Sequence, residues 1–312
     1  MSRTAEGSSR SPVRRLVAVL VLALAVVAVV LFLVSRGGPV ALAPTASPSP
    51  TPIPIDQALL NRRVTFLLLG TDQNAARERS HETPLTDSMI VLSINAAHTQ
   101  LTMISVPRDT VDVPLPDGSP WRQKLNSLYS QKGVDTLRDT LDGLLGAKID
   151  YVIMVNMDDF STIVDAFGGV DLTVPEAIND PSIGLNIKAG KQHLDGKTAQ
   201  LYSRSRHTTD DFSRADRQHR VLLALLAKFD DPKTKLDLGL LLKGLHSLKT
   251  DIPTAKIPTM VEIARRSRNA KVTSQVLQPP TFYEVVIESV RGYILEPNLQ
   301  AIKRYAAPLL TG

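Results

Sequence analysis

Five arginines gather between residues 202 and 220, in the stretch YSRSRHTTDDFSRADRQHR. They are Arg204, Arg206, Arg214, Arg217 and Arg220. A guanidinium group presents a planar fork of donors that binds phosphate oxygens in pairs, so such a cluster predicts a phosphorylated ligand. The same stretch contains Asp210, Asp211 and Asp216. These acids leave open a second interpretation, a surface lattice of ion pairs that contributes little to stability.

The spacing of these residues predicts two elements that converge on one ligand. The first set is Tyr202, Arg204 and Arg206, and the second set is Arg214, Arg217 and Gln218. Members of the first set are two apart, which places them on one face of a strand. Members of the second share a face at the start of a helix predicted over 213–229, with Ser213 as its N-cap. The N-terminus of a helix also attracts an anion.

Two carboxylates lie at the ends of strands predicted elsewhere in the chain. Asp72 follows the apolar run VTFLLL at 64–69, and Asp87 comes immediately before a strand predicted over 88–94. Ligands of open α/β sheets tend to bind at strand ends, and carboxylate oxygens suit a hard cation such as Mg²⁺. Taken singly, each aspartate is better explained as a turn or cap residue. No clustered histidine–cysteine pattern indicates zinc.

The elements that must position these groups alternate between strands and helices. A strand predicted over 101–106 delivers Arg108, and Pro107 blocks further pairing. A polar connection makes this strand and the one at 88–94 a predicted hairpin. Helices are also predicted over 134–145 and 158–167, and strands over 151–155 and 170–174. The order predicts a layered α/β/α domain around a central mixed sheet, whereas residues 245–312 show no chemistry of their own.

The N-terminal region predicts a membrane anchor. Residues 16–34, LVAVLVLALAVVAVVLFLV, are an apolar run long enough for a helix to cross a bilayer. Four arginines precede this run and one follows it closely, which predicts a cytoplasmic tail at 1–15 and an extracytoplasmic remainder. A cleaved signal peptide, cut after Ala-Leu-Ala at 41–43, is the alternative. Residues 35–56 are rich in proline and predict an extended tether before a folded domain over 57–312.

Composition excludes several classes of protein. The chain has no cysteine, so disulfides, thiolate metal sites and cysteine nucleophiles are excluded. The formal net charge is +5, but residues 1–36 hold five arginines against one glutamate, so only about +1 remains for the rest. The predicted extracytoplasmic part therefore has no general basic character, and no nucleic acid partner is expected.

The order and spacing of these motifs resemble the LytR-CpsA-Psr cell-envelope proteins over about residues 63–230. The shared pieces are Gly-x-Asp at 70–72, Thr-Asp-Ser-Met at 86–89, Ser-x-Pro-Arg-Asp at 105–109, Lys-Leu-Asn at 124–126, Phe-Gly-Gly-Val at 167–170, Leu-Asp-Gly at 194–196, Tyr-x-Arg-x-Arg at 202–206 and Asp-Phe-x-Arg-x-x-Arg-Gln at 211–218. One position departs from the family's pattern. An arginine commonly stands two places before the aspartate that matches Asp87, where this chain has Leu85, and this puts donor affinity or specificity in doubt.

The resemblance implies a membrane-anchored, extracytoplasmic transferase that moves a glycopolymer from a polyprenyl-pyrophosphate carrier to a hydroxyl of peptidoglycan or another envelope polymer. It implies that Asp72 and Asp87 hold Mg²⁺, with Mn²⁺ as the alternative ion. It assigns pyrophosphate binding to Arg108, Arg204, Arg206, Arg214, Arg217 and Gln218, and catalysis to Asp87, Arg108 and Asp211. Asp211 would orient the arginines or help to activate the acceptor. A hydrolase that uses the same clamp and a non-catalytic module that binds envelope polyanions remain open as alternatives.

Such a reaction needs no special nucleophile from the protein. Positioning and cationic stabilisation of the phosphoryl oxygens supply most of the catalysis. The polyprenyl tail needs an apolar cavity, and the helix predicted over 213–229 has a basic beginning and an apolar continuation.

Overall fold

The computed structural model describes residues 55–311 apart from 74–76, 78, 81–82, 207–209, 232, 246–247 and 288–289. The predicted cytoplasmic tail, the membrane span at 16–34 and nearly all of the tether at 35–56 lie outside the described residues. Within the described residues, no helix is long and apolar enough to cross a membrane.

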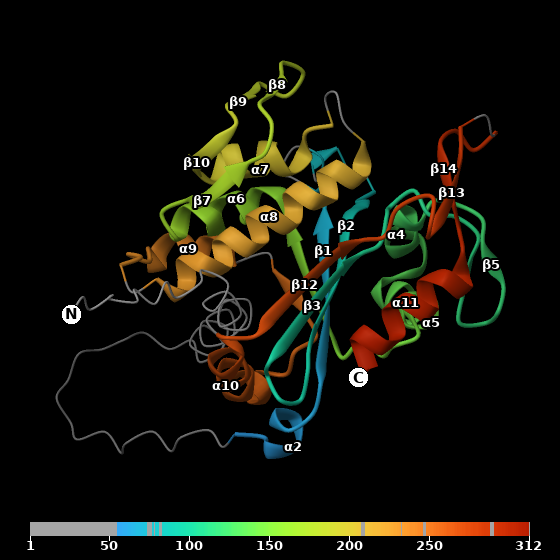
Figure 1. The fold of residues 1–312 in the computed structure, drawn as a ribbon, viewed down its shortest axis with the longest axis horizontal. Coiled ribbons are helices and arrows are strands. Elements are labelled where there is room, and N and C mark those ends of the chain that lie inside the picture. Colours follow the sequence, from blue (N-terminus) through green and yellow to red (C-terminus); the bar gives the residue numbers. More distant parts are fainter. Residues whose placement is uncertain are drawn as a thin grey trace, which may run out of the picture.

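A six-stranded mixed sheet forms the centre of the molecule, as predicted (Figure 1). Its order is β11 (Lys249–Thr250), β6 (Tyr151–Asn156), β1 (Val64–Thr71), β2 (Thr86–Ile94), β3 (Gln100–Ser105) and β12 (Lys271–Val276). β1, β2 and β3 are antiparallel neighbours, which confirms the predicted hairpin, whereas β6 is parallel to β1 and β12 is parallel to β3.

Helices cover both faces of this sheet. On one face, α5 (Val134–Leu145) and α11 (Leu299–Thr311) pack against Leu67 and Leu69 of β1. On the other face, Phe66 meets α8 (Asp211–Asp230) and α10 (Ile257–Ser267). The burial alternates along β1 because successive side chains of a strand point to opposite faces. Figure 1 shows the resulting layers.

A second group of elements lies beyond α8. It consists of α6 (Met157–Ala166), β7 (Val170–Val174), β10 (Gly190–Leu194), α7 (Gly196–Arg204) and α9 (Leu238–Gly244), which share a hydrophobic core. β7 pairs with β10 in a separate two-stranded sheet. The smaller elements are α2 (Gln57–Leu60), β4 (Val113–Pro114), β5 (Pro120–Trp121), α4 (Leu128–Lys132), β8 (Ile178–Asp180), β9 (Leu185–Ile187), β13 (Tyr283–Val286), β14 (Ile294–Pro297), and short 3₁₀ turns at Leu125–Ser127 and Thr254–Lys256.

Residues 202–206 are not a strand, contrary to the prediction from their spacing. α7 continues to Arg204, and an extended residue, Ser205, ends it. The helix is favoured because Asp195 caps its N-terminus by accepting a hydrogen bond from Thr198 N, and because it buries Ala199 and Tyr202 three residues apart. The alternation of 202–206 therefore reflects the end of a helix and the start of a loop.

Two boundaries near the predicted site also differ from the sequence interpretation. α8 begins at Asp211, and its N-cap is Asp210, whose carboxylate accepts a hydrogen bond from Ser213 N at 2.8 Å. Asp87 lies within β2 and not before it. The final region also contributes a strand to the central sheet, β12, whose largely polar sequence KVTSQV gave no strand signal.

Candidate active site

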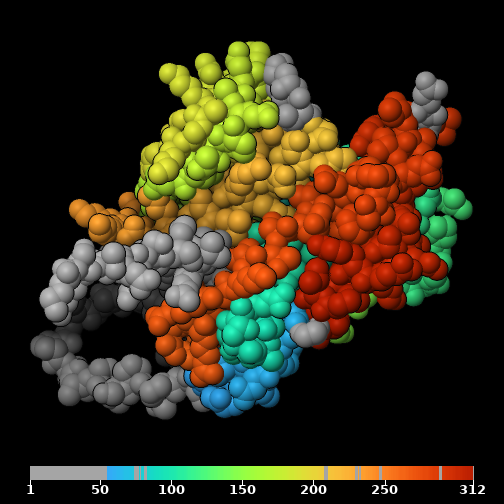
Figure 2. Space-filling model, viewed as in Figure 1, coloured from blue at the N-terminus to red at the C-terminus, as the bar shows by residue number. Residues whose placement is uncertain are grey.

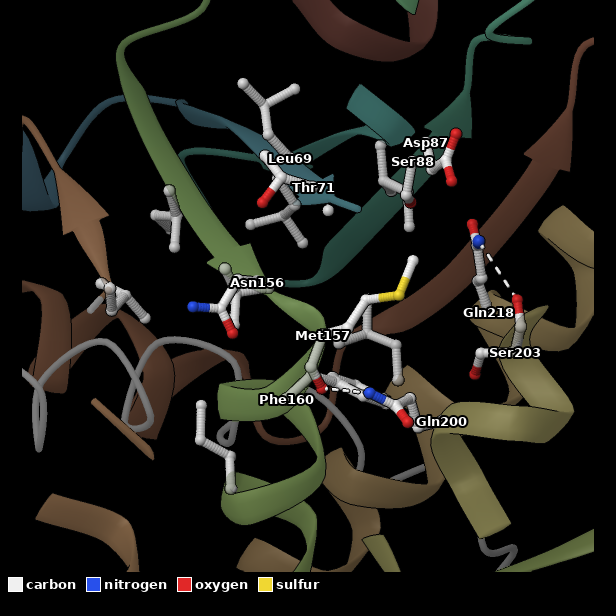
Figure 3. A pocket seen from close by; sticks show the side chains of 18 of the residues that line it. Leu69, Thr71, Asp87, Ser88, Asn156, Met157, Phe160, Gln200, Ser203 and Gln218 are labelled. Carbon is white, nitrogen blue, oxygen red and sulfur yellow. Dashed lines mark hydrogen bonds between the residues drawn. The ribbon is translucent and has the colours of Figure 1, made fainter. Parts of the chain in front are cut away.

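An apolar cavity of about 220 Å³ lies between the central sheet and the helices α6, α7, α8 and α9. Strand residues such as Leu68 and Ile153 form one wall. Leu222 and Leu225 of α8 and Phe160 of α6 are among those that form the other. Figure 3 shows Asp87 and Gln218 on one side of this cavity, with Phe160 and Gln200 farther along it. The cavity thus has a polar boundary and an apolar interior.

A polar cavity of about 360 Å³ adjoins the apolar one. Arg204, Arg206 and Arg214 line it, and Asp87 and Asp180 are its acids. Asp87 and Arg204 also line the apolar cavity, so the two spaces meet at these side chains. We call the polar cavity the mouth. An anionic group bound there has apolar space directly beside it.

Asp87 reaches the mouth because β2 is irregular at this residue. Gly70 pairs with Ser88 and Thr71 pairs with Thr86, which leaves Asp87 as an extra residue in the β1–β2 ladder. A bulge of this kind redirects a side chain and frees its backbone groups. Here the freed carbonyl of Asp87 accepts a hydrogen bond from Arg214 Nη2 at 3.2 Å. A Cβ at Gly70 would lie only 3.0 Å from Ser88 Cβ, so glycine allows this close approach.

Arg108 connects the acids on three segments. Its Nη1 is 2.5 Å from Asp87 Oδ1, and its Nε is 3.1 Å from Asp211 Oδ2. Asp109 lies at a longer distance of 3.5 Å and is also paired with Lys124 at 2.7 Å. Burial acts to lower the pKa of Arg108, but the carboxylates of Asp87 and Asp211 outweigh it and raise the pKa above the usual arginine value.

Asp211, the first residue of α8, contacts two further arginines. Its Oδ2 lies 3.6 Å from Arg214 Nη2, and its Oδ1 lies 3.5 Å from Arg206 Nη1. Burial acts to raise the pKa of Asp211, but Arg214 and Arg108 help to hold it below the ordinary aspartate value. An ionised carboxylate shared by three guanidinium groups fixes their orientation.

Arg214 has capacity left for a ligand. Arg214 is only 6% exposed, and its Nε has no hydrogen-bond partner in the described part of the chain. Burial lowers its pKa, although Asp211 acts in the opposite direction. A buried donor without a partner is costly, and a phosphate oxygen in the mouth would satisfy it. Ser203 Oγ, beside the apolar cavity, is likewise buried without a partner among the described residues.

The remaining predicted binding groups differ in position. Arg204 and Gln218 line the apolar cavity, and Gln218 Nε2 donates to the Ser203 carbonyl at 3.4 Å. Arg217 is not among the residues that line the cavities described here. It is buried, and its Nη2 donates to the carbonyl of Ser205, between Arg204 and Arg206. Arg217 therefore supports the loop that presents the other arginines.

Asp87 and Asp72 differ in how well they fit a divalent cation. Asp87 lines the mouth, and Arg108 Nη1 contacts its Oδ1 at 2.5 Å. Asp72 instead pairs with Arg77 and accepts a hydrogen bond from Leu85 N at 2.8 Å. Within the described residues, no group of three or more His, Cys, Asp or Glu side chains could hold a metal ion. Asp87 fits an ion that takes its other ligands from a substrate, whereas Asp72 fits one only when its pair with Arg77 opens.

Several motifs found in the sequence act as supports for the mouth. Within Lys-Leu-Asn at 124–126, Asn126 N donates to the Arg108 carbonyl at 3.1 Å. Gly196 lies against α6, where a Cβ would come within 2.0 Å of the Ser161 carbonyl oxygen. This contact allows α7 to pack on α6 and so to place Arg204 at the mouth. These glycine and asparagine positions serve geometry and not chemistry.

Sequence reasoning missed two polar groups near the site. Asp180 lines the mouth, and its carboxylate accepts hydrogen bonds from the hydroxyls of Ser182 at 2.5 Å and Ser205 at 2.7 Å. His219 is buried between Ser105 Oγ at 2.7 Å and Ser274 Oγ at 2.6 Å. No motif signals Asp180, whereas the place of His219 beside Gln218 in an amphipathic helix could have indicated burial.

The chain is similar in sequence to other bacterial proteins. An uncharacterized protein of Staphylococcus aureus is 26% identical over 245 residues, which cover 74% of this chain and 60% of that protein. A TagU of Bacillus mycoides, named a polyisoprenyl-teichoic acid–peptidoglycan teichoic acid transferase, is 30% identical over 220 residues, 70% of this chain and 68% of that protein. The chain thus spans less than two thirds of the staphylococcal protein.

The fold is also shared with solved structures. The crystal structure of B. subtilis TagV matches 80% of this chain and 96% of that chain with a TM-score of 0.61 and 24% sequence identity. The LytR_cpsA_psr family matches residues 45–304, which include both the sheet and the mouth. This match extends over most of the sequence, and the chain therefore belongs to the LytR_cpsA_psr family.

Proposed function

We propose that this protein is a membrane-anchored, extracytoplasmic phosphotransferase. Its donor is a glycopolymer carried on a polyprenyl pyrophosphate, and its acceptor is a hydroxyl of peptidoglycan or another envelope polymer. Membership of the family and the transferase name of the Bacillus mycoides relative support this class of reaction. The anchor is proposed from the apolar run at 16–34.

The observation that carries the proposal is the junction of the mouth with the apolar cavity. Asp87 and Arg204 border both spaces, and Arg214 contributes a buried, unsatisfied donor. A lipid pyrophosphate combines two adjacent anionic groups with a hydrocarbon tail, so one ligand satisfies both spaces. A soluble polyanion would leave the apolar cavity unused, and an uncharged lipid would leave Arg214 Nε unsatisfied.

In the proposed reaction, the acceptor oxygen attacks the phosphorus that bears the glycan. A new P–O bond forms to the acceptor, and the bond from that phosphorus to the bridging oxygen breaks. The electron pair stays on the bridging oxygen, which leaves as part of polyprenyl phosphate, and the acceptor releases its proton to water. Arg204, Arg206 and Arg214 hold the oxygens on which negative charge grows, and preorganised cations stabilise that charge in the transition state.

We assign Asp211 to positioning and not to proton abstraction. It already contacts the guanidinium groups of Arg108, Arg206 and Arg214, and its lowered pKa makes it a weak base. Arg217 has a positioning role of another kind, because it binds the backbone of the loop between Arg204 and Arg206.

Asp87 is the residue that we propose to hold Mg²⁺, with Asp72 joining when its pair with Arg77 opens. The ion, when bound, would supply positive charge to the pyrophosphate oxygens. Arg108 keeps the Asp87 carboxylate in place from the protein side.

The experiment that tests the proposal uses the full chain in lipid vesicles with a synthetic polyprenyl pyrophosphate that carries a short glycan, and isolated peptidoglycan as acceptor. Arg214→Ala is expected to lower transfer by about 10²–10³-fold, the typical effect of removing one donor to a developing oxyanion. The matched control is Arg220→Ala on the same helix, because Arg220 is half-exposed and lies 4.0 Å from Asp216. This control should retain transfer within about twofold.

Product analysis separates the related reactions. Phosphoglycan joined to peptidoglycan, together with polyprenyl monophosphate, supports transfer. Free phosphoglycan in the presence of acceptor would indicate a hydrolase instead. Unchanged turnover of the Arg214 variant, or turnover lost equally in the Arg220 variant, would contradict the proposed clamp.

A further inference from the structure

α9 exposes leucines on one face and buries leucines on the other. Leu241 and Leu245 are buried and line the apolar cavity. Leu238 and Leu242 are 61% and 43% exposed, and their spacing of four residues places them on the same outer face of the helix. α9 is therefore a thin wall, one helix wide, between the apolar cavity and the surroundings of the protein.

Four lysines lie within α9 or close to it in the sequence. They are Lys233, Lys235, Lys243 and Lys249, and all four are exposed. Between residues 233 and 249 the single acid is Asp237, which caps α9 by accepting a hydrogen bond from Leu240 N at 3.0 Å. Asp231 and Asp251 flank this stretch; Asp231 accepts a hydrogen bond from Lys233 N, and Asp251 pairs with Arg138. In the described part of the chain, none of the four lysines forms an ion pair with a carboxylate. Exposed leucines with unpaired lysines near them in the sequence are typical of a surface that lies on an anionic bilayer.

A second exposed apolar region offers a comparison. The hairpin formed by β13 and β14 exposes Val285, Ile287, Val290 and Tyr293. Residues 283–297, however, contain three glutamates and one arginine, and that arginine, Arg291, pairs with Asp112 and Glu296. An anionic surface would repel this region. Figures 1 and 2 show α9 and the hairpin at opposite ends of the molecule in this view.

We propose that the outer face of α9, with its four lysines, binds the surface of an anionic lipid bilayer. Binding there places the wall of the apolar cavity against the membrane. A lipid tail could then reach the cavity with little exposure to water, which is favourable because each methylene kept from water lowers the free energy. The surface itself is independent of the transfer reaction, and only its use for donor entry rests on the proposed function.

The absence of cysteine allows a direct test with the full chain. Leu242→Cys and Val290→Cys each introduce one exposed thiol, which is labelled with an environment-sensitive fluorophore. The labelled proteins are reconstituted into vesicles that contain phosphatidylglycerol and nitroxide-bearing lipids. We expect lipid quenching of the label at position 242 and none at position 290. Vesicles of phosphatidylcholine alone should give little quenching at either position.

Charge variants measure the electrostatic part of the binding. Lys235→Gln and Lys243→Gln should each lower, by about fivefold, the ratio of protein with α9 on the membrane to protein with α9 away from it. This is the usual effect of one basic residue at an anionic surface. High salt should have the same effect. Lys132→Gln provides the control, because Lys132 is exposed at the end of α4. That variant should leave the quenching at position 242 unchanged.

Three outcomes would overturn the proposal. Quenching at position 290 without quenching at 242 would assign the membrane contact to the hairpin. A label at 242 that is shielded in detergent, and more so at higher protein concentration, would indicate a second copy of the chain. Absence of quenching at both positions would show that neither region binds lipid. The measurement needs no donor, so a failure of the transfer assay leaves it interpretable.

Discussion

The mouth and the apolar cavity adjoin each other but are built in different ways. The mouth and its support combine Asp87 of β2, Arg108 after β3, Arg204 of α7 and Arg214 of α8, which come from four separate parts of the chain. The apolar cavity is formed largely by leucines and isoleucines of strands and helices that also make up the hydrophobic cores. The mouth therefore depends on a few exact orientations, whereas the cavity depends on volume.

This difference predicts separate consequences for mutations. A lost guanidinium in the mouth removes charge stabilisation and should lower the rate for any donor. A filled cavity should weaken binding in proportion to the length of the donor's tail. Substitutions in the two regions can therefore test whether they serve one ligand.

The largest effect is expected for Arg108→Ala. The substitution leaves Asp87, Asp211 and Asp109 close together without their shared guanidinium. Transfer should fall about 10³-fold, and the free energy of unfolding should fall by about 3 kcal/mol because buried carboxylates lose their partner. Turnover with long-tailed and short-tailed donors, together with denaturant unfolding, measures both effects.

A control and a conservative variant complete this test. Arg122→Ala removes an exposed arginine whose pair with Asp112 is 3.6 Å long, and it should change neither quantity. Arg108→Lys should recover more of the stability than of the activity, since an ammonium keeps the charge but not the fork. An Arg108→Ala protein that is stable but still active would remove Arg108 from the proposed site.

The sequence predicted which residues gather at the mouth better than the elements that carry them. Arginine types and motif spacing identified Arg204 and Arg214, but the alternation of 202–206 was wrongly interpreted as a strand, because local spacing does not report the cap at Asp195. The bulge at Asp87 could not be predicted, since it depends on the pairing of β1 with β2. The long, strongly periodic elements, such as the helix at 134–145, were predicted correctly.

The apolar cavity was predicted only as a need of the ligand. Leucines that line a cavity and leucines that fill a core have the same pattern in a helix, so residues such as Leu222 and Leu225 could not be distinguished from core positions. Asp180 was missed for a similar reason. It lies in β8, within a separate hairpin, and only the tertiary fold brings it beside Ser205.

The next effect concerns the pH dependence of stability where α8 packs on the central sheet. His219 joins α8 to β3 and β12 through Ser105 and Ser274, and burial lowers its pKa to about 4 from an ordinary value of 6.5. The unfolded chain therefore binds a proton between pH 6.5 and pH 4 that the folded chain does not bind. Protonation of this histidine therefore leaves the free energy of unfolding unchanged above pH 6.5. As the pH falls from 6.5 to 4, the free energy of unfolding decreases by about 3 kcal/mol.

Denaturant unfolding across this pH range measures the effect, with His219→Gln as the comparison. The variant should show a flatter dependence between pH 6.5 and pH 4, because its amide does not titrate. The control is His193→Gln, since His193 is exposed and pairs with Asp171 at 2.7 Å. Equal slopes in the wild type and the His219 variant would show that the buried imidazole does not govern this pH range.

A smaller effect is expected when the apolar cavity is filled. Leu222→Trp adds volume to a half-buried side chain that lines the cavity. If the cavity holds the tail, KM for a long-tailed donor should rise about tenfold, the equivalent of about two displaced methylenes, whereas kcat should change little. Leu299→Trp, at an exposed position outside the cavity, is the control. An equal rise in KM for a short-tailed donor would show that the cavity does not bind the tail.

The smallest effect is expected for Arg206→Ala, which compares two arginines of the mouth with each other. The Arg206 side chain is 51% exposed and its nearest carboxylate oxygen is 3.5 Å away, whereas Arg214 is buried. Water screens an exposed charge, so the loss should amount to about 1 kcal/mol or less, a fall in transfer of up to about fivefold. Raising the salt concentration should reduce the difference between wild type and this variant, because an exposed charge is screened. A fall as large as that of Arg214→Ala would mean that the bound donor buries Arg206, and that the mouth closes around its ligand.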